Sequence, residues 1–595
     1  MTKINRRKFI SAAGIAGAGV ALSSALPAWA QSASMGVNRQ AETLSGPDVA
    51  LRVAQSHWMV DGRSGHATTI NGTVPGPLIR LREGQNVRLS VANELDEDTS
   101  IHWHGLIVPF QMDGVPGVSF PGIRPRQTFV YEFPIRQSGT YWYHSHSGLQ
   151  EQEGLYGPII IDPAGADPVQ SDREYVVVLS DFSFMHAHTI FQRLKQQSGA
   201  FNMQRETVAG LVAGREQSFA DRREWAGMRM DPTDVSDVTG AAYKFLINGH
   251  GPQDNWTGIF RPGERVRLRF INAAAMTIFN VRIPGMSMEV VASDGQNVRP
   301  VGVDEFQISI AETYDVIVRP TEDRAYTLVA EAVDRSGMAR ATLAPRAGMT
   351  AEVPALRARP LATMRDMGMD MSGGAMAWPG AEGAAPSMAG MDHGQSGSQG
   401  GMSMDMGGMD MSMRNPANAP GVPLGPGVQT IAPMAADRMG DPGQGLEDAG
   451  HKVLLYTDLQ SLAPNPDMRA PSRSLQLHLT GNMERFMWSF DGQRFSEITA
   501  PIPFRLNERV RVTLVNDSMM AHPIHLHGHF FELVTGAPGH RPRKHTVNVL
   551  PGGTATFDLT ADAPGDWAFH CHMLYHMHAG MFRVVSVRPL EGARS

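Results

Sequence analysis

Three stretches of the chain share one alternation of apolar and polar residues, and each ends in asparagine. They are residues 87–93 (VRLSVAN), 266–272 (VRLRFIN) and 510–516 (VRVTLVN). Such alternation is typical of a half-buried strand. A second shared strand pattern follows at residues 127–131, 312–316 and 553–557. Short strands with Gly and Pro turns, repeated in units of about 120 to 170 residues, predict three β-sandwich domains in tandem.

Histidines stand at matched offsets in two of the three repeats. Nine and eleven residues after the closing asparagine, the three copies carry, in order, His102 and His104, Val281 and Ile283, and His525 and His527. A later strand adds a second pair, because residues 139–146 (GTYWYHSH) match residues 565–572 (GDWAFHCH). The middle copy, around residues 326–330, has no histidine. The first and third repeats therefore contribute four histidines each.

Each of these pairs has one residue between its two histidines. Alternate side chains of a strand point to the same face, so both imidazoles of a pair project to one side. Eight imidazoles from two homologous domains are predicted to meet across an interface and hold several metal ions. Zinc also accepts imidazole, and the choice of metal depends on the remaining ligands.

The only cysteine of the 595-residue chain lies inside the last of these pairs, as Cys571. His576 and Met581 follow it, and one thiolate, imidazole and a weak axial thioether are the ligands of a blue-copper site. This set favours copper over zinc. His570 and His572 project to one face of the strand and Cys571 to the other. A copper ion held by Cys571 would lie only a few covalent bonds from metal held by its two neighbours.

Four segments together resemble the ligand segments of the multicopper oxidases. They are residues 102–105 (HWHG), 142–146 (WYHSH), 522–529 (HPIHLHGH) and 570–581 (HCHMLYHMHAGM). The resemblance implies an all-β fold of three tandem cupredoxin-like β-sandwich domains and oxidation of a donor by dioxygen. It also implies four copper ions, one of type 1, one of type 2 and two of type 3. The implied ligands are His522, Cys571, His576 and Met581 for type 1, His102 and His525 for type 2, and His104, His144, His572, His146, His527 and His570 for type 3.

The expected organisation follows from the repeats and from two unusual segments. It comprises a twin-arginine signal peptide (1–30), cupredoxin-like domain 1 (31–170), cupredoxin-like domain 2 without copper ligands (171–350), a Met/Gly-rich insert (351–450), and cupredoxin-like domain 3 with type 1 copper (451–595). Arg6 and Arg7 precede an Ala/Gly-rich run that ends in a small-x-small cleavage site at residues 28–30. This predicts a periplasmic protein exported folded. The alternative is a short N-terminal membrane anchor; no other segment is apolar for long enough to span a bilayer.

The insert is rich in methionine and poor in residues that build a core. Thirteen methionines lie between residues 364 and 413, among Gly, Ser, Pro and Asp. Thioether is a soft ligand that selects Cu(I), so the segment is a candidate for Cu(I) capture, with a compositional linker as the alternative. The candidate residues are Met367, Met369, Met371, Met402, Met404, Met406, Met409, Met411 and Met413.

The net charge of the chain and the carboxylate of Asp113 narrow the possible functions further. A net charge of −7 without a basic cluster argues against nucleic acid as a partner. Asp113 matches a carboxylate that supplies protons in similar oxidases, or it is a turn residue before Gly114. The leading hypothesis is a copper-resistance oxidase that converts Cu(I) to Cu(II) with dioxygen. Periplasmic copper-handling proteins are its candidate partners. A laccase-like oxidase of phenols or amines, and a copper-sequestering protein, are the alternatives.

Overall fold

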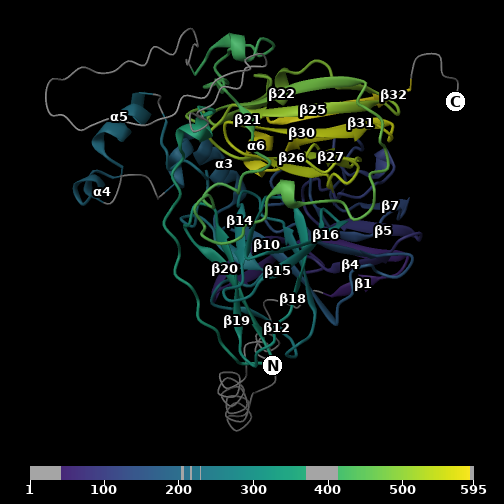
Figure 1. Cartoon of the computed structure of the whole chain (residues 1–595). Coiled ribbons are helices and arrows are strands. Elements are labelled where there is room, and N and C mark those ends of the chain that lie inside the picture. The colour runs from purple at the N-terminus through teal and green to yellow at the C-terminus, as the bar shows by residue number, and fades with distance from the viewer. Residues whose placement is uncertain (1–41, 203–206, 215–216, 228–229, 370–412, 590–595) are drawn as a thin grey trace, which may run out of the picture.

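The computed structural model describes residues 42–202, 207–214, 217–227, 230–369 and 413–589. These residues form three two-sheet units that follow one another along the chain (Figure 1). The all-β class predicted from the repeats is therefore confirmed. Among the described residues, no helix combines the length and the apolar character needed to cross a bilayer.

The first unit packs a four-stranded sheet against a five-stranded one. The four-stranded sheet has the order β3-β2-β5-β7, formed by β3 (Arg63–Ile70), β2 (Asp48–Val60), β5 (Asn86–Asn93) and β7 (Thr128–Pro134). The other has the order β1-β4-β9-β8-β6, formed by β1 (Thr43–Ser45), β4 (Leu78–Arg82), β9 (Tyr156–Asp162), β8 (Gly139–His144) and β6 (His102–His104).

The second unit has the same two-sheet design, with six strands in one sheet and five in the other. One sheet runs β11 (Lys244–Ile247), β10 (Arg173–Phe182), β13 (Val266–Asn272), β18 (Thr313–Val318), β15 (Met288–Ser293) and β16 (Gln296–Val303). The other runs β12 (Trp256–Ile259), β20 (Met338–Ala344), β19 (Tyr326–Ala332), β14 (Phe279–Arg282) and β17 (Glu305–Ile308). Helices α3 (Ala187–Gln196), α4 (Val208–Val212) and α5 (Phe219–Gly227) interrupt it between β10 and β11.

The third unit carries the C-terminal ligand segments. One sheet runs β23 (Met487–Phe490), β22 (Arg473–Asn482), β25 (Arg509–Asn516), β30 (Gly553–Thr560), β27 (Phe531–Leu533) and β28 (Arg543–Lys544), and β21 (Ala436–Asp437) pairs with β30. The other runs β24 (Ile502–Arg505), β32 (Phe582–Arg588), β31 (Gly565–Cys571), β26 (His522–Leu526) and β29 (Thr546–Val549). Helix α6 (Leu574–His578) follows β31 directly.

The repeated sequence patterns occupy equivalent strands. The first pattern forms β5, β13 and β25, and each of these pairs antiparallel with the strand of the second pattern, β7, β18 or β30. The histidine strands also pair with each other, with His102 opposite His144 and His525 opposite His570. In the middle unit Val281 lies opposite Ala330 instead, and both are fully buried. Backbone register therefore brings two histidine pairs together in the outer units and an apolar pair in the middle one.

Packing between the units involves the helical excursion of the second unit. Figure 1 shows α4 and α5 standing out to one side, whereas α3 lies against the third unit. Phe191 of α3 stacks on Tyr575 of α6, with ring centroids 5.8 Å apart. Lys195 donates a hydrogen bond to the Phe486 carbonyl. The second and third units share one continuous apolar core, which some residues of the first unit join, among them Trp58 and Trp142; the other buried apolar residues of the first unit form a separate core.

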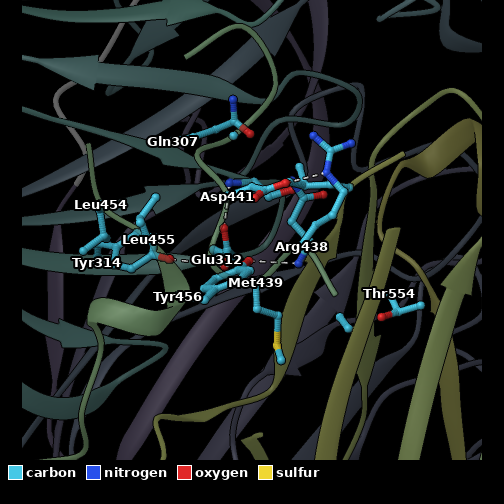
Figure 2. Close-up of a pocket in the computed structure, with 15 residues that line it drawn as sticks. Gln307, Glu312, Tyr314, Arg438, Met439, Asp441, Leu454, Leu455, Tyr456 and Thr554 are labelled. Carbon is cyan, nitrogen blue, oxygen red and sulfur yellow. Dashed lines mark hydrogen bonds and ion pairs between the residues drawn. The ribbon is translucent and has the colours of Figure 1, made fainter. Parts of the chain in front are cut away.

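A small cavity of about 40 Å³ lies where the second unit meets the third (Figure 2). Beside it, Tyr456 donates a 2.7 Å hydrogen bond to Glu312. The Lys544 ammonium is fully buried, 3.1 Å from Glu312 and 3.1 Å from Asp294. Burial lowers the pKa of Lys544, but the two carboxylates outweigh burial and raise it above its ordinary value. Asp294 also accepts from the backbone N–H groups of His545 and Thr546. This ion cluster fixes the chain at His545, between β28 and β29. The His545 carbonyl in turn contacts His525 of β26.

Candidate metal centre

Cys571, His522 and His576 form one compact group at the end of β31. The Cys571 Sγ lies 3.6 Å from His522 Nδ1 and 3.9 Å from His576 Nδ1, and the two nitrogens are 3.3 Å apart. All three side chains are fully buried. Met581 is buried too, and its backbone bonds to both Cys571 and His576. The four residues expected at type 1 copper therefore lie together. Thiolate and imidazole are the donor set that copper requires at such a site.

The outer nitrogen of each of these histidines has a partner of its own. His522 Nε2 lies 2.7 Å from Ser518 Oγ, and His576 Nε2 lies 2.6 Å from Asp237 Oδ2. Asp237 belongs to the second unit, just before β11. Such outer contacts fix the ring orientation and direct the Nδ1 lone pairs toward the thiol. Trp488 also stacks on His576, with centroids 3.9 Å apart.

Burial shapes the ionisation of this group. It lowers the pKa of His576 to about 3 and that of His522 well below its ordinary value, where the charge of His576 adds to the effect. Both imidazoles are therefore neutral at pH 7 and have a lone pair for a metal. Burial also raises the pKa of the Cys571 thiol above its ordinary value, so a bound cation is needed to keep the thiolate.

Eight further histidines gather between the first and third units. Within each group the ligating atoms lie within 4.8 Å of one another. The groups are His104, His144 and His572; His146, His527 and His570; and His102, His104 and His525. The first two match the residues expected at the two type 3 ions. The third contains the expected type 2 pair, together with His104, which is shared between groups. The structure thus brings together all eight histidines of the predicted cluster.

The inward nitrogens of this cluster fit metal ions. Nε2 of His102, His144, His525 and His572 is buried without a hydrogen-bond partner in the part of the chain that the structure describes. A buried polar atom without a partner is costly, and a metal ion removes that cost. The Nε2 atoms of His146 and His527 instead point at that of His570, at 3.4 and 3.0 Å. Burial lowers the pKa of His570 to about 4, and it lowers the pKa well below the ordinary value for His104, His144, His146, His525, His527 and His572, so these side chains are neutral ligands at pH 7.

The outward nitrogens are held by acceptors. Nδ1 of His102 donates to the Asp113 carbonyl and Nδ1 of His525 to the His545 carbonyl, both at 2.7 Å. Nδ1 of His527 donates to the Asp113 carboxylate at 2.9 Å. These contacts select the tautomer with Nε2 free, which is the form that binds a metal. Asp113, expected from the sequence as a proton donor, is buried against two of the predicted ligands.

Two glycines follow the His-x-His pairs for a steric reason. Gly105 has φ +79°, and a Cβ there would lie 2.4 Å from His545 Nε2. Gly528 has φ +68°, and a Cβ there would lie 2.4 Å from the Trp567 ring. Both sites need a left-handed backbone and leave no room for a side chain. The turns that follow His104 and His527 therefore depend on glycine.

Cys571 connects the two kinds of group. His570 belongs to one trio of the cluster and His572 to the other, whereas Cys571 faces His522 and His576. Three consecutive residues thus reach three separate groups. This is the arrangement that the alternation of the strand predicts.

Sequence reasoning missed several residues that contact the ligands. Glu151 is buried and lies 2.7 Å from His144 Nδ1 and 3.9 Å from His572 Nδ1. Burial raises its pKa well above the ordinary value. The sequence offers one hint of this contact, because Glu151 stands only five residues after the predicted ligand His146. Asp237, Ser518 and the His545 carbonyl had no comparable signal, because they belong to no shared pattern.

The candidate methionines are only partly visible. Met367, Met369 and Met413 lie together around Trp225 and Met519. The other candidates, Met371, Met402, Met404, Met406, Met409 and Met411, lie outside the described residues, as do residues 1–30 of the predicted signal peptide.

Comparisons with known proteins agree with this geometry. Family models described as multicopper oxidase match residues 52–166, 173–351 and 468–591. Copper resistance protein A of Escherichia coli is 48% identical over 611 aligned residues, which cover 99% of this chain and 100% of that protein. Copper resistance protein A of Pseudomonas syringae pv. tomato is also 48% identical, covering 98% and 99%. Multicopper oxidase MmcO of Mycobacterium tuberculosis is 29% identical, covering 97% and 96%.

Solved structures show the same fold at lower identity. Fet3p, a multicopper oxidase that functions in iron import, superposes with a TM-score of 0.61 at 19% identity, over 92% of this chain and 90% of that one. A laccase from Botrytis aclada gives 0.60 at 21%, over 92% and 88%. Copper is accordingly the metal implied for the groups described above, and the chain belongs to the multicopper oxidase family.

Proposed function

We propose that this protein is a periplasmic copper-resistance oxidase that converts Cu(I) to Cu(II) and reduces dioxygen to water. One observation carries the proposal: Cys571 lies in a thiolate–imidazole group while its two neighbours belong to the histidine trios. A protein that only stores copper has no need of a covalent link between two kinds of site. The names of the relatives that are 48% identical support the assignment to copper resistance.

The proposed copper content is one type 1, one type 2 and two type 3 ions. His522, Cys571, His576 and Met581 would hold type 1, and His102 and His525 type 2. The type 3 ions would take the remaining six histidines: His104, His144, His572, His146, His527 and His570. When bound, copper supplies the one-electron redox chemistry that couples single-electron donors to the four-electron reduction of dioxygen.

The protein's own residues would direct electrons and protons. Cys571 and its neighbours provide the short covalent route from the thiolate group to the histidine cluster. Asp113 touches His102 and His527, and we assign it the role of proton donor to that cluster. Four Cu(I), one dioxygen and four protons then yield four Cu(II) and two waters. Export by the twin-arginine route, through residues 1–30, would place this reaction where copper enters the cell.

Dioxygen uptake by protein purified with copper tests the proposal. Adding Cu(I) should start uptake in the native protein, and the native protein should be blue. Cys571→Ser should be colourless and should not take up dioxygen, because the electron route is cut. Copper binding without uptake would instead indicate sequestration. Uptake with a phenol but not with Cu(I) would indicate a laccase-like oxidase.

A further inference from the structure

Two histidines outside the predicted copper sites face each other across a β-ribbon. His57 of β2 lies directly opposite His66 of β3. Their ring centroids are 4.8 Å apart, and the ring planes are inclined by 44°. Both residues are exposed. β2 and β3 belong to the four-stranded sheet of the first unit, whereas β6 and β8, which lead that unit's predicted ligands into the cluster, belong to the other sheet. The pair is therefore separate from the metal centre.

The ring nitrogens of this pair are available to a ligand. In the part of the chain that the structure describes, no side-chain hydrogen bond or ion pair involves His57 or His66. The exposed His186, by contrast, has an acceptor, because its Nδ1 lies 3.0 Å from Glu153 Oε1. A single exposed imidazole is simply hydrated, whereas two that face each other can hold one ion together. No partner has to be displaced before a metal ion binds to the pair.

The ribbon that carries the pair is held at its back and at its tip. Trp58, next to His57 on the opposite face, is buried in the apolar core shared with the second unit. A Cβ at Gly65, which pairs with Trp58, would lie 3.0 Å from the Phe182 ring of that unit. At the tip, the Asp61 carboxylate accepts hydrogen bonds from two backbone N–H groups of the second unit, at 2.8 and 3.2 Å. The backbone thus fixes the spacing of the two histidines, and binding an ion orders only their side chains.

The spacing of the pair suits chelation of one ion. Bonds from a metal to imidazole nitrogen are about 2.0 Å long, so two nitrogens on one ion lie at most about 4 Å apart. Rings whose centroids are 4.8 Å apart bring one nitrogen each within that limit after small side-chain rotations. Among divalent first-row ions Cu(II) binds such nitrogen ligands most tightly, and it accepts a tetragonal set of nitrogen and oxygen donors. Cu(I) prefers sulfur, and structural zinc sites take four protein ligands.

We propose that His57 and His66 form a surface site for Cu(II), with both imidazoles as ligands and water in the remaining positions. No electron is transferred at this site. The site itself does not depend on the proposed function, but the source of its ion rests on that function, because Cu(II) is the product of the proposed oxidation of Cu(I). The pair would retain one product ion per chain on a face of the first unit, so the same protein would both oxidise copper and hold it.

Cu(II) binding by the copper-loaded, full-length protein tests the site. The protein is titrated with Cu(II) and followed by calorimetry and electron paramagnetic resonance, and crystals soaked in Cu(II) are examined for anomalous scattering at the copper edge. We expect a peak between the two rings and a Cu(II) signal coupled to two imidazole nitrogens. His57→Gln and His66→Gln should each bind this ion at least about tenfold more weakly, because one imidazole cannot chelate. His57→Gln/His66→Gln should lose one Cu(II) per chain. Both exposed positions tolerate glutamine, so the melting temperature should not change.

His186→Gln provides the matched control, because it removes another exposed histidine and should leave the ion between His57 and His66 in place. Equal Cu(II) stoichiometry and affinity in the native protein and in His57→Gln/His66→Gln, with no copper peak between the rings, would overturn the inference even if the native protein oxidises Cu(I). Loss of the ion in only one of the two single variants would also overturn it, because the ion would then have a single imidazole ligand. Conversely, Cu(II) held by the pair in a protein that takes up no dioxygen with Cu(I) would overturn the proposed function and leave the binding site standing.

Discussion

Asp237 holds a predicted copper ligand, although it comes from the unit that contributes no histidine pair. Its Oδ2 accepts from His576 Nε2 at 2.6 Å, with both side chains buried. Asp237→Ala removes the acceptor and leaves the imidazole N–H unpaired in the interior. Burial raises the pKa of Asp237 to about 8, so its carboxyl changes charge near neutral pH, whereas Asp237→Asn keeps an acceptor oxygen of the same reach and stays neutral. The pair of variants separates the hydrogen bond from the charge.

The expected size of the effect follows from the burial of this contact. Leaving a buried donor without its partner costs about 1–3 kcal/mol. Outer contacts of metal-binding histidines typically contribute about 10–100-fold in metal affinity, which corresponds to the same range of free energy. We therefore expect Asp237→Ala to weaken copper binding at the Cys571 group about 10–100-fold. Asp237→Asn should lose less than about tenfold, since the hydrogen bond survives.

Chelator competition measures this affinity. Copper-loaded protein is titrated with a chelator of known affinity while the blue absorption of the Cys571 group is followed. His478→Gln is the control, because it breaks a buried His–Asp pair of the same kind outside the ligand groups. In that pair His478 Nδ1 lies 2.7 Å from Asp517 Oδ2. It should lose stability and keep its copper. Retention of blue colour by Asp237→Ala at the chelator concentration that the native protein tolerates would refute the reasoning.

Three further predictions follow from buried charges. Copper-free protein should lose stability as the pH falls below about 6.5, because histidines of the unfolded chain take up protons there and the buried histidines of the folded protein do not. For His570, whose folded pKa is about 4, the loss of unfolding free energy reaches about 3 kcal/mol by pH 4. A Tm of the copper-free protein that stays constant between pH 7 and 5 would contradict this. Asp113→Asn should keep its copper but lower kcat about 100-fold with an unchanged KM for Cu(I), measured by dioxygen uptake, and a native kcat would exclude Asp113 as proton donor. Lys544→Met should lower the unfolding free energy, measured by chemical denaturation, by about 3–5 kcal/mol, because two buried carboxylates lose their cation. Lys452→Met, at the exposed surface, should lower it by almost nothing. Equal losses in the two variants would show that the ion cluster is unimportant.

Strand periodicity made the repeat architecture readable from the sequence. Residues 266–272 could be recognised as a copy of residues 87–93 because a half-buried strand alternates with a period of two. The matched offsets then placed Val281 where His102 stands in the first unit, and the pairing of β14 with β19 agrees with that alignment. The helices between β10 and β11 were not predicted, because this excursion has no counterpart in the other two repeats.

The ligands and their outer partners differ in how the sequence encodes them. His102 and His144, like His525 and His570, face one another across antiparallel strands, and register fixes their distance once the strands pair. Spacing along the chain therefore carries the geometry of the ligands. Asp237 meets His576 across 339 residues, through the packing of the helical excursion on the third unit, and Glu151 reaches His144 through a loop. No period links such residues to their partners. The middle unit, which carries no histidine pair, thus still shapes the metal centre, because its Asp237 holds His576.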